Sequence, residues 1–298
     1  MKNMPTVHEA TFRDNYRRYI GPLASELPAT LGMNTSTHVA EVCLDPDEPK
    51  KSERAVVKYF RFTDQGWANE YVAWLLACEL GVVTPPRASL LIGNHDEITE
   101  GHGEELKTVA RFDSGPMVLW CTSAVEPTRP VQQVFAKPWE RVALGVESGR
   151  RMAAFDGWTG NCDRLHQNTL YWTTGHTLVA IDHEKIAFNQ DWTTAPLQHF
   201  DMMLDAAGEP KIRTRLLDAL TRALSSSDNA VKKKAKEAKS AMFEHSKVSH
   251  PAALKLCSGL ISRLLDSNFS NESSENLLSF LEHRLSDECM KSRYGYAI

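Results

Sequence analysis

Residues 155–168 read Phe-Asp-Gly-Trp-Thr-Gly-Asn-Cys-Asp-Arg-Leu-His-Gln-Asn, and Ile-Asp-His follows at 181–183. An aspartate therefore precedes an asparagine by five residues, and a second aspartate comes directly after a short hydrophobic segment. Carboxylate and amide oxygens are ligands that magnesium prefers, and a carboxylate can also accept a proton. The stretch predicts a loop that combines a general base with metal ligands.

A β-hairpin is predicted between the two parts of this pattern. Residues 169–172 and 177–181 have the β-branched and aromatic composition of short strands, and 173–176 (Thr-Thr-Gly-His) suit a turn. A hairpin returns the chain to its starting point. Asp182 is therefore expected beside Asn168, where the two side chains could share one metal ion.

The polar residues of this region fit the needs of phosphoryl transfer. In that reaction the protein mainly positions the substrates, while magnesium neutralises phosphate charge. Asp163 is predicted to accept or orient the proton of the attacking hydroxyl, and Asn168 and Asp182 are predicted to bind the metal. The alternative is an ordinary loop, because Asp and Asn are common loop formers.

An upstream segment supplies a lysine and a glutamate at a suitable spacing. Residues 55–60 (Ala-Val-Val-Lys-Tyr-Phe) predict a strand from which Lys58 projects. A helix is predicted over 69–81, opened by Glu70 and ended by a glycine, and Glu70 would hold Lys58 toward the phosphates. The apolar stripe of this helix comprises Val72, Leu75, Leu76 and Leu80.

Lys58 and Glu70 each have a simpler explanation when taken alone. Lys58 could be the charge of an edge strand, and Glu70 an acidic residue favoured by the dipole of the first helical turn. The order of the parts favours the functional interpretation. A strand lysine, a helix glutamate, an Asp-x4-Asn loop and a final Ile-Asp follow one another as in two-lobed kinases. The sequence predicts a phosphotransferase that uses ATP and magnesium.

Residues 32–42 contain one glycine and several hydroxyl residues ahead of a predicted strand. Backbone N–H groups of such a turn could bind phosphates. Gly32, Asn34, Thr35 and Ser36 are therefore predicted, together with Lys58, to contact the nucleotide. A plain hairpin turn is an equal alternative, because the segment lacks the repeated glycines of known phosphate-binding loops.

Taken together, these motifs resemble the HipA-like kinases, a toxin-related bacterial branch of the protein kinase and phosphoinositide kinase superfamily. The resemblance extends over residues 30–190 and rests on the motifs at 155–168 and 181–183, on 57–60, and on 69–86. It implies a lysine on the ATP phosphates, its glutamate partner, a catalytic aspartate, two magnesium ligands and two residues that brace the loop. These are, in order, Lys58, Glu70, Asp163, Asn168 and Asp182, and Arg164 with Asn161.

Two positions depart from the family pattern. Many relatives have histidine two residues after the catalytic aspartate, where this chain has Leu165 followed by His166. The simpler members have glycine after Ile-Asp-His, where this chain has Glu184. The metal ligands are retained, and the expected effects concern loop mobility and access of the phosphates.

The predicted fold class is α+β, with the bilobal arrangement of protein kinases. Residues 1–125 are expected to form a strand-rich, nucleotide-binding lobe with one main helix. Residues 126–298 are expected to form a helical lobe with a catalytic loop at 156–168 and a metal-binding hairpin at 169–183. The segment 126–130 (Glu-Pro-Thr-Arg-Pro) suits the crossing between them.

Hydrophobic periodicity predicts the helices of the second lobe. Amphipathic patterns lie at 212–224, 254–265 and 277–285, and another pattern, from Trp139 through Val146 to Phe155, predicts one helix that leads into the catalytic loop. The basic run at 232–239 is interpreted as a solvated helix face and, less readily, as a patch for a partner.

Composition excludes several other classes of protein. The 298 residues carry a net charge of −4, which gives no reason to expect direct nucleic-acid binding. The six cysteines contain no Cys-x-x-Cys pair, and neither a secretory leader nor a membrane span is recognisable. Reduced thiols and a cytoplasmic location are expected.

The leading hypothesis is transfer of the γ-phosphate of ATP to a serine or threonine of a protein. The resemblance to toxin kinases implies a growth-inhibiting role, a substrate in the translation apparatus and an antitoxin partner. A small-molecule or lipid kinase is the first alternative, although residues 186–192 lack the basic cluster that inositol phosphates would need. A pseudokinase or nucleotide-dependent binding module is the second.

Overall fold

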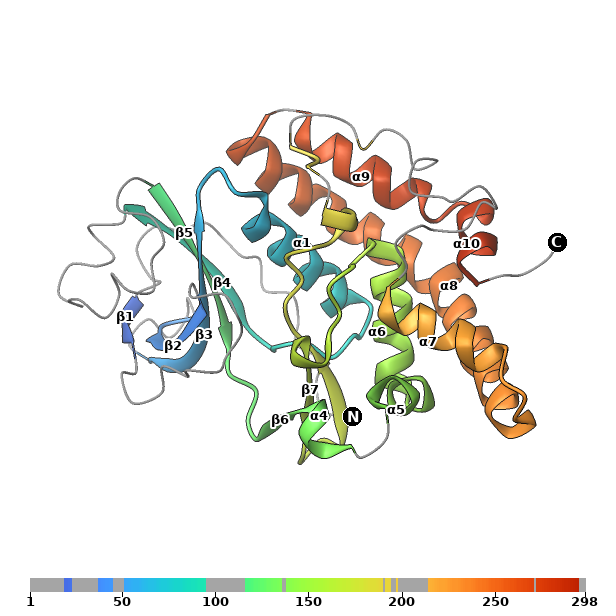
Figure 1. Cartoon of the computed structure of the whole chain (residues 1–298). Helices are drawn as coiled ribbons and strands as arrows, with labels where there is room; N and C mark the ends of the chain where they lie inside the picture. The colour runs from blue at the N-terminus through green and yellow to red at the C-terminus, as the bar shows by residue number, and fades with distance from the viewer. Residues whose placement is uncertain are drawn as a thin grey trace. The chain divides into compact units, whose positions relative to one another are not determined.

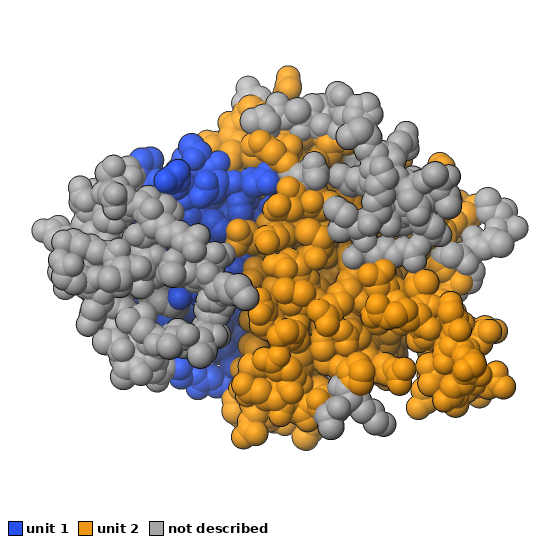
Figure 2. Space-filling view, viewed as in Figure 1, with its two compact units in different colours: residues 1–71, 85–126 blue, residues 72–84, 127–298 orange. Residues whose placement is uncertain are grey.

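The computed structural model of the chain describes residues 19–22, 37–44, 51–94, 116–135, 138–189, 191–193, 197, 214–270 and 272–294. The chain divides into two compact units, which Figure 2 colours separately. The first comprises Met1–Tyr71 and Pro85–Glu126, and the second Val72–Thr84 and Pro127–Ile298. The assignment of nucleotide binding to residues 1–125 and of catalysis to 126–298 stays a prediction.

The first unit contains a five-stranded antiparallel sheet (Figure 1). In spatial order its strands are β1 (Tyr19–Pro22), β2 (Thr37–Val42), β3 (Glu53–Arg61), β5 (Pro116–Ser123) and β4 (Ala88–Asn94). β3 is the central strand and contains residues 55–60, so the predicted strand around Lys58 is confirmed.

Alternate residues of β2, β3 and β5 form an apolar cluster on one face of this sheet. β3 contributes Ala55, Val57 and Tyr59, all of which are buried. Because successive side chains of a strand point to opposite faces, Lys58 lies on the other face. The other buried members of the cluster are Ala40, Val42, Leu44, Met117, Leu119 and Cys121.

Helix α1 (Gln65–Glu79) begins four residues before its predicted start at residue 69. The predicted start is wrong because residues 66–77 are all buried, and a helix buried on every side lacks the polar face that marks its beginning. The predicted end at a glycine is confirmed. Gly81 has a φ of 62°, and its N–H and that of Val82 donate to the carbonyls of Cys78 and Ala77 at 3.1 and 2.9 Å.

The second unit contains a small antiparallel sheet of β6 (Thr128–Pro130), β7 (Thr169–Trp172) and β8 (Thr177–Ala180). β7 and β8 form the predicted hairpin, with Thr169 opposite Ala180 and Trp172 opposite Thr177. His176 in the connecting turn has a left-handed φ of 49°. The hairpin prediction is therefore confirmed, including its turn.

Helices make up most of the second unit (Figure 1). α8 contacts α6, α7, α9 and α10, so it is the helix around which the others pack. The α+β class, with one strand-rich part and one mostly helical part, is confirmed. Within the described ranges no helix is long and apolar enough to cross a membrane. The helices are α4 (Val131–Val134), α5 (Trp139–Gly145), α6 (Glu147–Thr159), α7 (Arg215–Leu224), α8 (Asn229–Asn268), α9 (Ser273–His283) and α10 (Asp287–Tyr294).

The single helix predicted from Trp139 to Phe155 is wrong, because the chain forms α5 and α6 with an extended residue between them. Val146, with φ −115° and ψ 152°, separates the two helices and is 37% exposed. A Cβ atom at Gly149 would lie 2.0 Å from the carbonyl oxygen of Ala143. Glycine at this position therefore lets α6 start directly against the end of α5.

The three amphipathic helices predicted for the C-terminal region are confirmed as α7, α8 and α9. Residue 212, at the start of the first pattern, lies outside the described residues. The basic run at 232–239 lies on α8, where only Ala235 and Ala238 are buried. The interpretation of this run as a solvated helix face is also confirmed.

Candidate active site

Lys58 and Glu70 form a partly buried ion pair in the first unit. Lys58 Nζ lies 2.5 Å from Glu70 Oε1, and the two side chains are 14% and 2% exposed. β3 presents the lysine on the face opposite to the apolar cluster, and the short connection to α1 places Glu70 in the second helical turn. A buried carboxylate needs a cation or hydrogen-bond donors beside it. The structure thus brings together the two residues that were predicted to pair.

Asp163, in the second unit, is held through its main chain. Its N–H donates to Asn161 Oδ1 at 3.1 Å, and its carbonyl accepts hydrogen bonds from Asn168 Nδ2 at 2.7 Å and Leu165 N at 2.8 Å. The Asp163 side chain is 28% exposed. A carboxylate that is fixed at its backbone and reaches solvent can accept a proton from a bound hydroxyl group.

Asn168 is 4% exposed, and the hydrogen bond from its Nδ2 to Asp163 fixes the orientation of its amide. Because Nδ2 faces the Asp163 carbonyl, the amide oxygen Oδ1 is turned away from it. This is the orientation in which Oδ1 could bind a cation outside the loop.

Arg164 is fully buried and joins three segments of the site. Its Nε and Nη2 atoms each donate to a carboxylate oxygen of Asp156 on α6 at 3.0 Å. Its Nη1 donates to the carbonyl oxygens of Asn168 at 2.7 Å and Ile181 at 2.5 Å. Its Nη2 also lies 2.9 Å from His183 Nδ1. Arg164 therefore holds both predicted metal-binding segments in register, which is the bracing that the resemblance implied.

Asp156 is the partner of Arg164 that the sequence interpretation missed. The carboxyl group is completely buried, and this burial raises its pKa, whereas the charge and hydrogen bonds of the Arg164 guanidinium act in the opposite direction. A buried arginine needs a nearby carboxylate, but the polar residues around Arg164 in the sequence gave no sign that it would be buried. The eight residues that separate Asp156 from Arg164 also did not by themselves specify the contact.

Asp182 follows β8 with a left-handed backbone, φ 62°. The N–H of the preceding Ile181 donates to the carbonyl oxygen of Asn168 at 3.3 Å, so the ends of the hairpin lie together as predicted. His183 is 2% exposed and packs edge-on against Phe155 at 5.6 Å between ring centroids. The left-handed backbone of Asp182 costs about 1–2 kcal/mol, because the residue is not a glycine, and such strain is common at functional sites.

A magnesium ion fits the donor set that the hairpin supplies. Asn168 and Asp182 offer an amide and a carboxylate oxygen, and magnesium in nucleotide sites needs only one or two protein ligands besides phosphate and water. Among the described residues, no group of three or more His, Cys, Asp and Glu side chains could hold a metal ion.

Lys185 is a second residue that the sequence interpretation missed. Its Nζ lies 3.6 Å from Asp163 Oδ2, and its side chain is 43% exposed. Its carbonyl oxygen accepts hydrogen bonds from the N–H of Cys162 at 3.4 Å and from Cys162 Sγ at 3.7 Å. The segment after the hairpin thus returns to the catalytic loop and places a cation beside the predicted base.

The chain continues into a left-handed turn at Ala187, Phe188 and Asn189, whose φ angles are 53°, 54° and 59°. Phe188 N donates to the carbonyl oxygen of Gly160 at 2.9 Å. A Cβ atom at Gly160, which has a φ of 67°, would lie 3.0 Å from the Phe188 ring. Glycine at the end of α6 therefore gives this turn room to pack against the start of the catalytic loop.

The predicted nucleotide-contacting residues Gly32, Asn34, Thr35 and Ser36 lie outside the described residues. Lys58 and Glu70 belong to the first unit, and Asp163, Asn168 and Asp182 to the second. The structure thus assembles each of these two groups within its own unit.

Comparison with known proteins yields a similarity of structure and none of sequence. No protein-family model matches the sequence, and no curated protein matches it either. Among solved structures, the crystal structure of the Helicobacter pylori proinflammatory kinase CtkA is similar to this chain, with 14% sequence identity and a TM-score of 0.49. The similarity covers 92% of this chain and 97% of that chain.

Proposed function

We propose that this protein is a kinase that transfers the γ-phosphate of ATP to a serine or threonine hydroxyl of a protein. The observation that carries the proposal is the hydrogen-bond network of Arg164, which ties the Asp163 loop to the segment that ends in Asp182. Phosphoryl transfer depends mainly on positioning and charge stabilisation, and a rigid loop with two oxygen ligands supplies both.

In this proposal each residue of the site has its own role in binding the nucleotide or in the transfer. Lys58, held by Glu70, binds the α- and β-phosphates, as a lysine of the third strand does when a helix glutamate accompanies it. Asn168 and Asp182 would hold magnesium, which neutralises the phosphate charge when it is bound. Lys185 adds a cation beside Asp163.

The reaction itself is a displacement at phosphorus. The substrate hydroxyl oxygen forms a bond to the γ-phosphorus, the bond from that phosphorus to the β–γ bridging oxygen breaks, and ADP leaves. The hydroxyl proton passes toward the Asp163 carboxylate. Resemblance to HipA-like kinases extends the proposal to a growth-inhibiting cytoplasmic enzyme with an antitoxin partner and a substrate in the translation apparatus.

The test is peptide mass spectrometry of a bacterial lysate incubated with magnesium, ATP and either wild-type protein or Asp163→Asn. We expect phosphoserine or phosphothreonine that depends on the wild-type protein and is lost in Asp163→Asn, because the variant lacks the group that accepts the proton. Asp287→Asn, on exposed Asp287 of α10, is the matched control and should behave as wild type.

Binding of magnesium–ATP to both proteins, measured by calorimetry, completes the test. We expect Asp163→Asn to retain it, because Asp163 acts on the hydroxyl and not on the nucleotide. Equal phosphorylation by wild type and Asp163→Asn would refute the role of Asp163. Nucleotide binding without transfer to any protein would favour a small-molecule kinase or a pseudokinase.

A further inference from the structure

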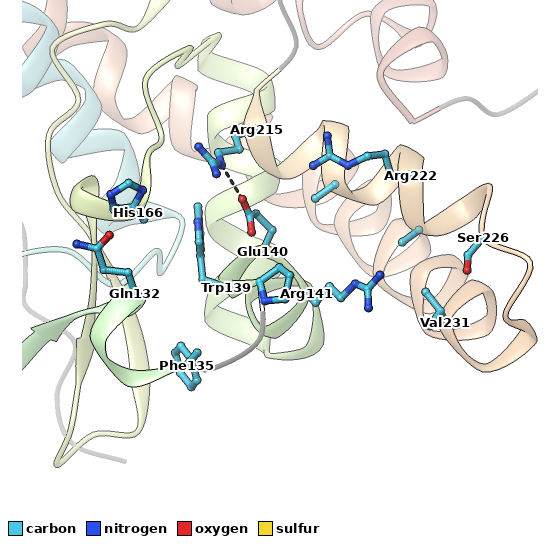
Figure 3. Close-up of a pocket in the computed structure, with 13 residues that line it drawn as sticks. Gln132, Phe135, Trp139, Glu140, Arg141, His166, Arg215, Arg222, Ser226 and Val231 are labelled. Carbon is cyan, nitrogen blue, oxygen red and sulfur yellow. Dashed lines mark hydrogen bonds and ion pairs between the residues drawn. The ribbon is translucent and has the colours of Figure 1, made fainter.

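A pocket of about 700 Å³ lies in the second unit, lined by α4, α5, α7, the start of α8 and the catalytic loop. Figure 3 shows the side chains that surround it. Its apolar wall includes Phe135, Trp139 and Val231. The charged residues that line it are Glu140, Arg141, Arg215 and Arg222, and His166 contributes an imidazole.

The charged side chains that line this pocket have a net positive charge, because three arginines accompany one glutamate. Arg215 Nε pairs with Glu140 Oε1 at 2.6 Å, so the glutamate that lines the pocket already has a cationic partner. Within the described part of the chain, the guanidinium groups of Arg141 and Arg222 have no ion pair or hydrogen bond. Arginines bind carboxylates and phosphates through parallel N–H···O bonds, so two such groups on one pocket are suited to an anion.

Trp139 gives a second reason, independent of the arginines, to expect a ligand in this pocket. The residue is 6% exposed, and its Nε1 has no acceptor among the described residues. Buried N–H donors in proteins are almost always hydrogen-bonded, so a donor that is left over at a pocket wall suits an acceptor on a ligand. An oxygen-rich anion in this pocket could accept a hydrogen bond from Trp139 or from the arginines.

The pocket adjoins the catalytic loop. His166 is in its lining and follows Asp163 by three residues, so their Cα atoms are at most about 11 Å apart. An extended peptide advances about 3.3 Å per residue. A peptide whose hydroxyl lies at Asp163 could therefore place a side chain a few residues away into the pocket.

We infer that this pocket binds an anionic side chain of the protein substrate, a glutamate or a phosphorylated residue, near the acceptor serine or threonine. The inference rests on the proposed function and gives it a substrate class. The net charge of −4 for the whole chain gives no general reason to expect a nucleic-acid partner, and a pocket of this size suits a single anionic group better than an extended phosphate backbone.

Binding of short fluorescein-labelled peptides, measured by anisotropy without ATP, tests the inference. Each peptide has a central serine in a neutral background, with glutamate, phosphoserine or glutamine placed at each flanking position in turn. We expect wild-type protein to bind at least one anionic peptide about tenfold more tightly than its glutamine counterpart. The tighter of the glutamate and phosphoserine peptides identifies the source of the anion.

The double variant Arg141→Gln/Arg222→Gln should lose this preference, and Trp139→Phe, which keeps the ring and removes the donor, should weaken it severalfold. Lys255→Gln/Arg263→Gln removes the same charge from exposed residues of α8 outside the pocket and should keep the preference. Thermal melting of each variant shows whether it is folded.

The inference is overturned if wild type binds all peptides equally, or if both double variants bind the anionic peptides as wild type does. A transfer assay on the same peptides keeps the two proposals separate. Anion-selective binding of the peptides, with no transfer to any peptide or to any protein of the lysate, would refute the proposed protein kinase activity and leave the anion site standing. Phosphorylation that ignores the flanking charge would refute the anion site and leave the kinase activity standing.

Discussion

Arg164 shows how one buried residue can organise a site. Its guanidinium donates hydrogen bonds to Asp156 and to the main chain of the two segments that are predicted to bind metal, and it lies within hydrogen-bond distance of His183. A buried charge of this kind is stable only with its partner, because water is no longer available to solvate it. The stability of the loop and its geometry therefore depend on the same contact.

Arg164→Leu should lower the free energy of unfolding by about 3–5 kcal/mol, because it leaves Asp156 buried without a cation. Urea denaturation followed by tryptophan fluorescence measures the change. The double variant Asp156→Leu/Arg164→Leu removes both charges and should recover part of the loss. A single variant as stable as wild type would contradict this account of the loop.

Lys185 is a second single residue with a predicted effect, and unlike Arg164 it is partly exposed. Because its ion pair with Asp163 is partly exposed, removing it should change the stability by less than about 1 kcal/mol. Lys185→Gln should nevertheless lower phosphoryl transfer about tenfold or more, because it removes a cation next to the reacting groups. Steady-state kinetics with Lys185→Arg as the control measures this, and equal rates for Lys185→Gln and wild type would exclude the role.

At the scale of elements, the ends of helices position the site. α1 ends in a glycine motif that closes the helix, and α6 ends at Gly160, where the chain turns into the catalytic loop. α8 begins at a capped end: Asp228 Oδ1 accepts hydrogen bonds from the N–H groups of Ala230 at 2.8 Å and Val231 at 3.3 Å. Val231 also lines the pocket that contains Arg141 and Arg222, so this cap supports one wall of that pocket.

Asp228→Ala should destabilise the start of α8 by about 1 kcal/mol, the usual cost of losing a side-chain cap. Faster amide hydrogen exchange in the first turn of α8 is the expected readout. Asp228→Asn keeps an acceptor oxygen and should show little change. If exchange is the same in all three proteins, Asp228 does not cap the helix in solution.

At the scale of the whole molecule, the second unit is held together by a buried aromatic and cationic cluster. Trp158 Nε1 donates to the carbonyl oxygen of Leu281 at 2.9 Å, and its ring stacks on His250 at 4.6 Å. Arg284 Nε donates to the Trp158 carbonyl oxygen at 2.7 Å. These contacts join α6, α8, α9 and the segment after α9. Burial lowers the pKa of His250 well below 6.5, and nearby His245 and Arg293 lower it further.

The folded protein should therefore become less stable as the pH falls below about 6.5. His250 stays neutral in the folded state, whereas the unfolded chain binds a proton, so acid favours unfolding by about 1.4 kcal/mol at one pH unit below the unfolded pKa. The pKa of His245 is also lowered, and its protonation would add to the effect.

Urea midpoints at pH 7.5 and 5.5 for wild type and His250→Leu, roughly one unit to either side of the unfolded pKa, measure this effect. The variant should lose less stability between the two values, because the residue that titrates has been removed. An equal loss in both proteins would show that His250 does not contribute to the pH dependence.

The sequence by itself determined the local elements. The strand that carries Lys58, the hairpin before Asp182 and the end of α1 at Gly81 follow from the alternation of apolar residues and from turn chemistry, which act between neighbours along the chain. The α+β class follows from the same patterns, added over the length of the chain.

Only the tertiary structure decided which distant side chains meet. The start of α1, the break at Val146, the pairing of Asp156 with Arg164 and the approach of Lys185 to Asp163 all depend on packing. Likewise, Arg141 of α5 and Arg222 of α7 line the same pocket, although residues 156–183 lie between the two helices in the sequence. The physical reason is that burial removes the polarity pattern that marks an element, and an ion pair depends on a distance that sequence spacing does not set.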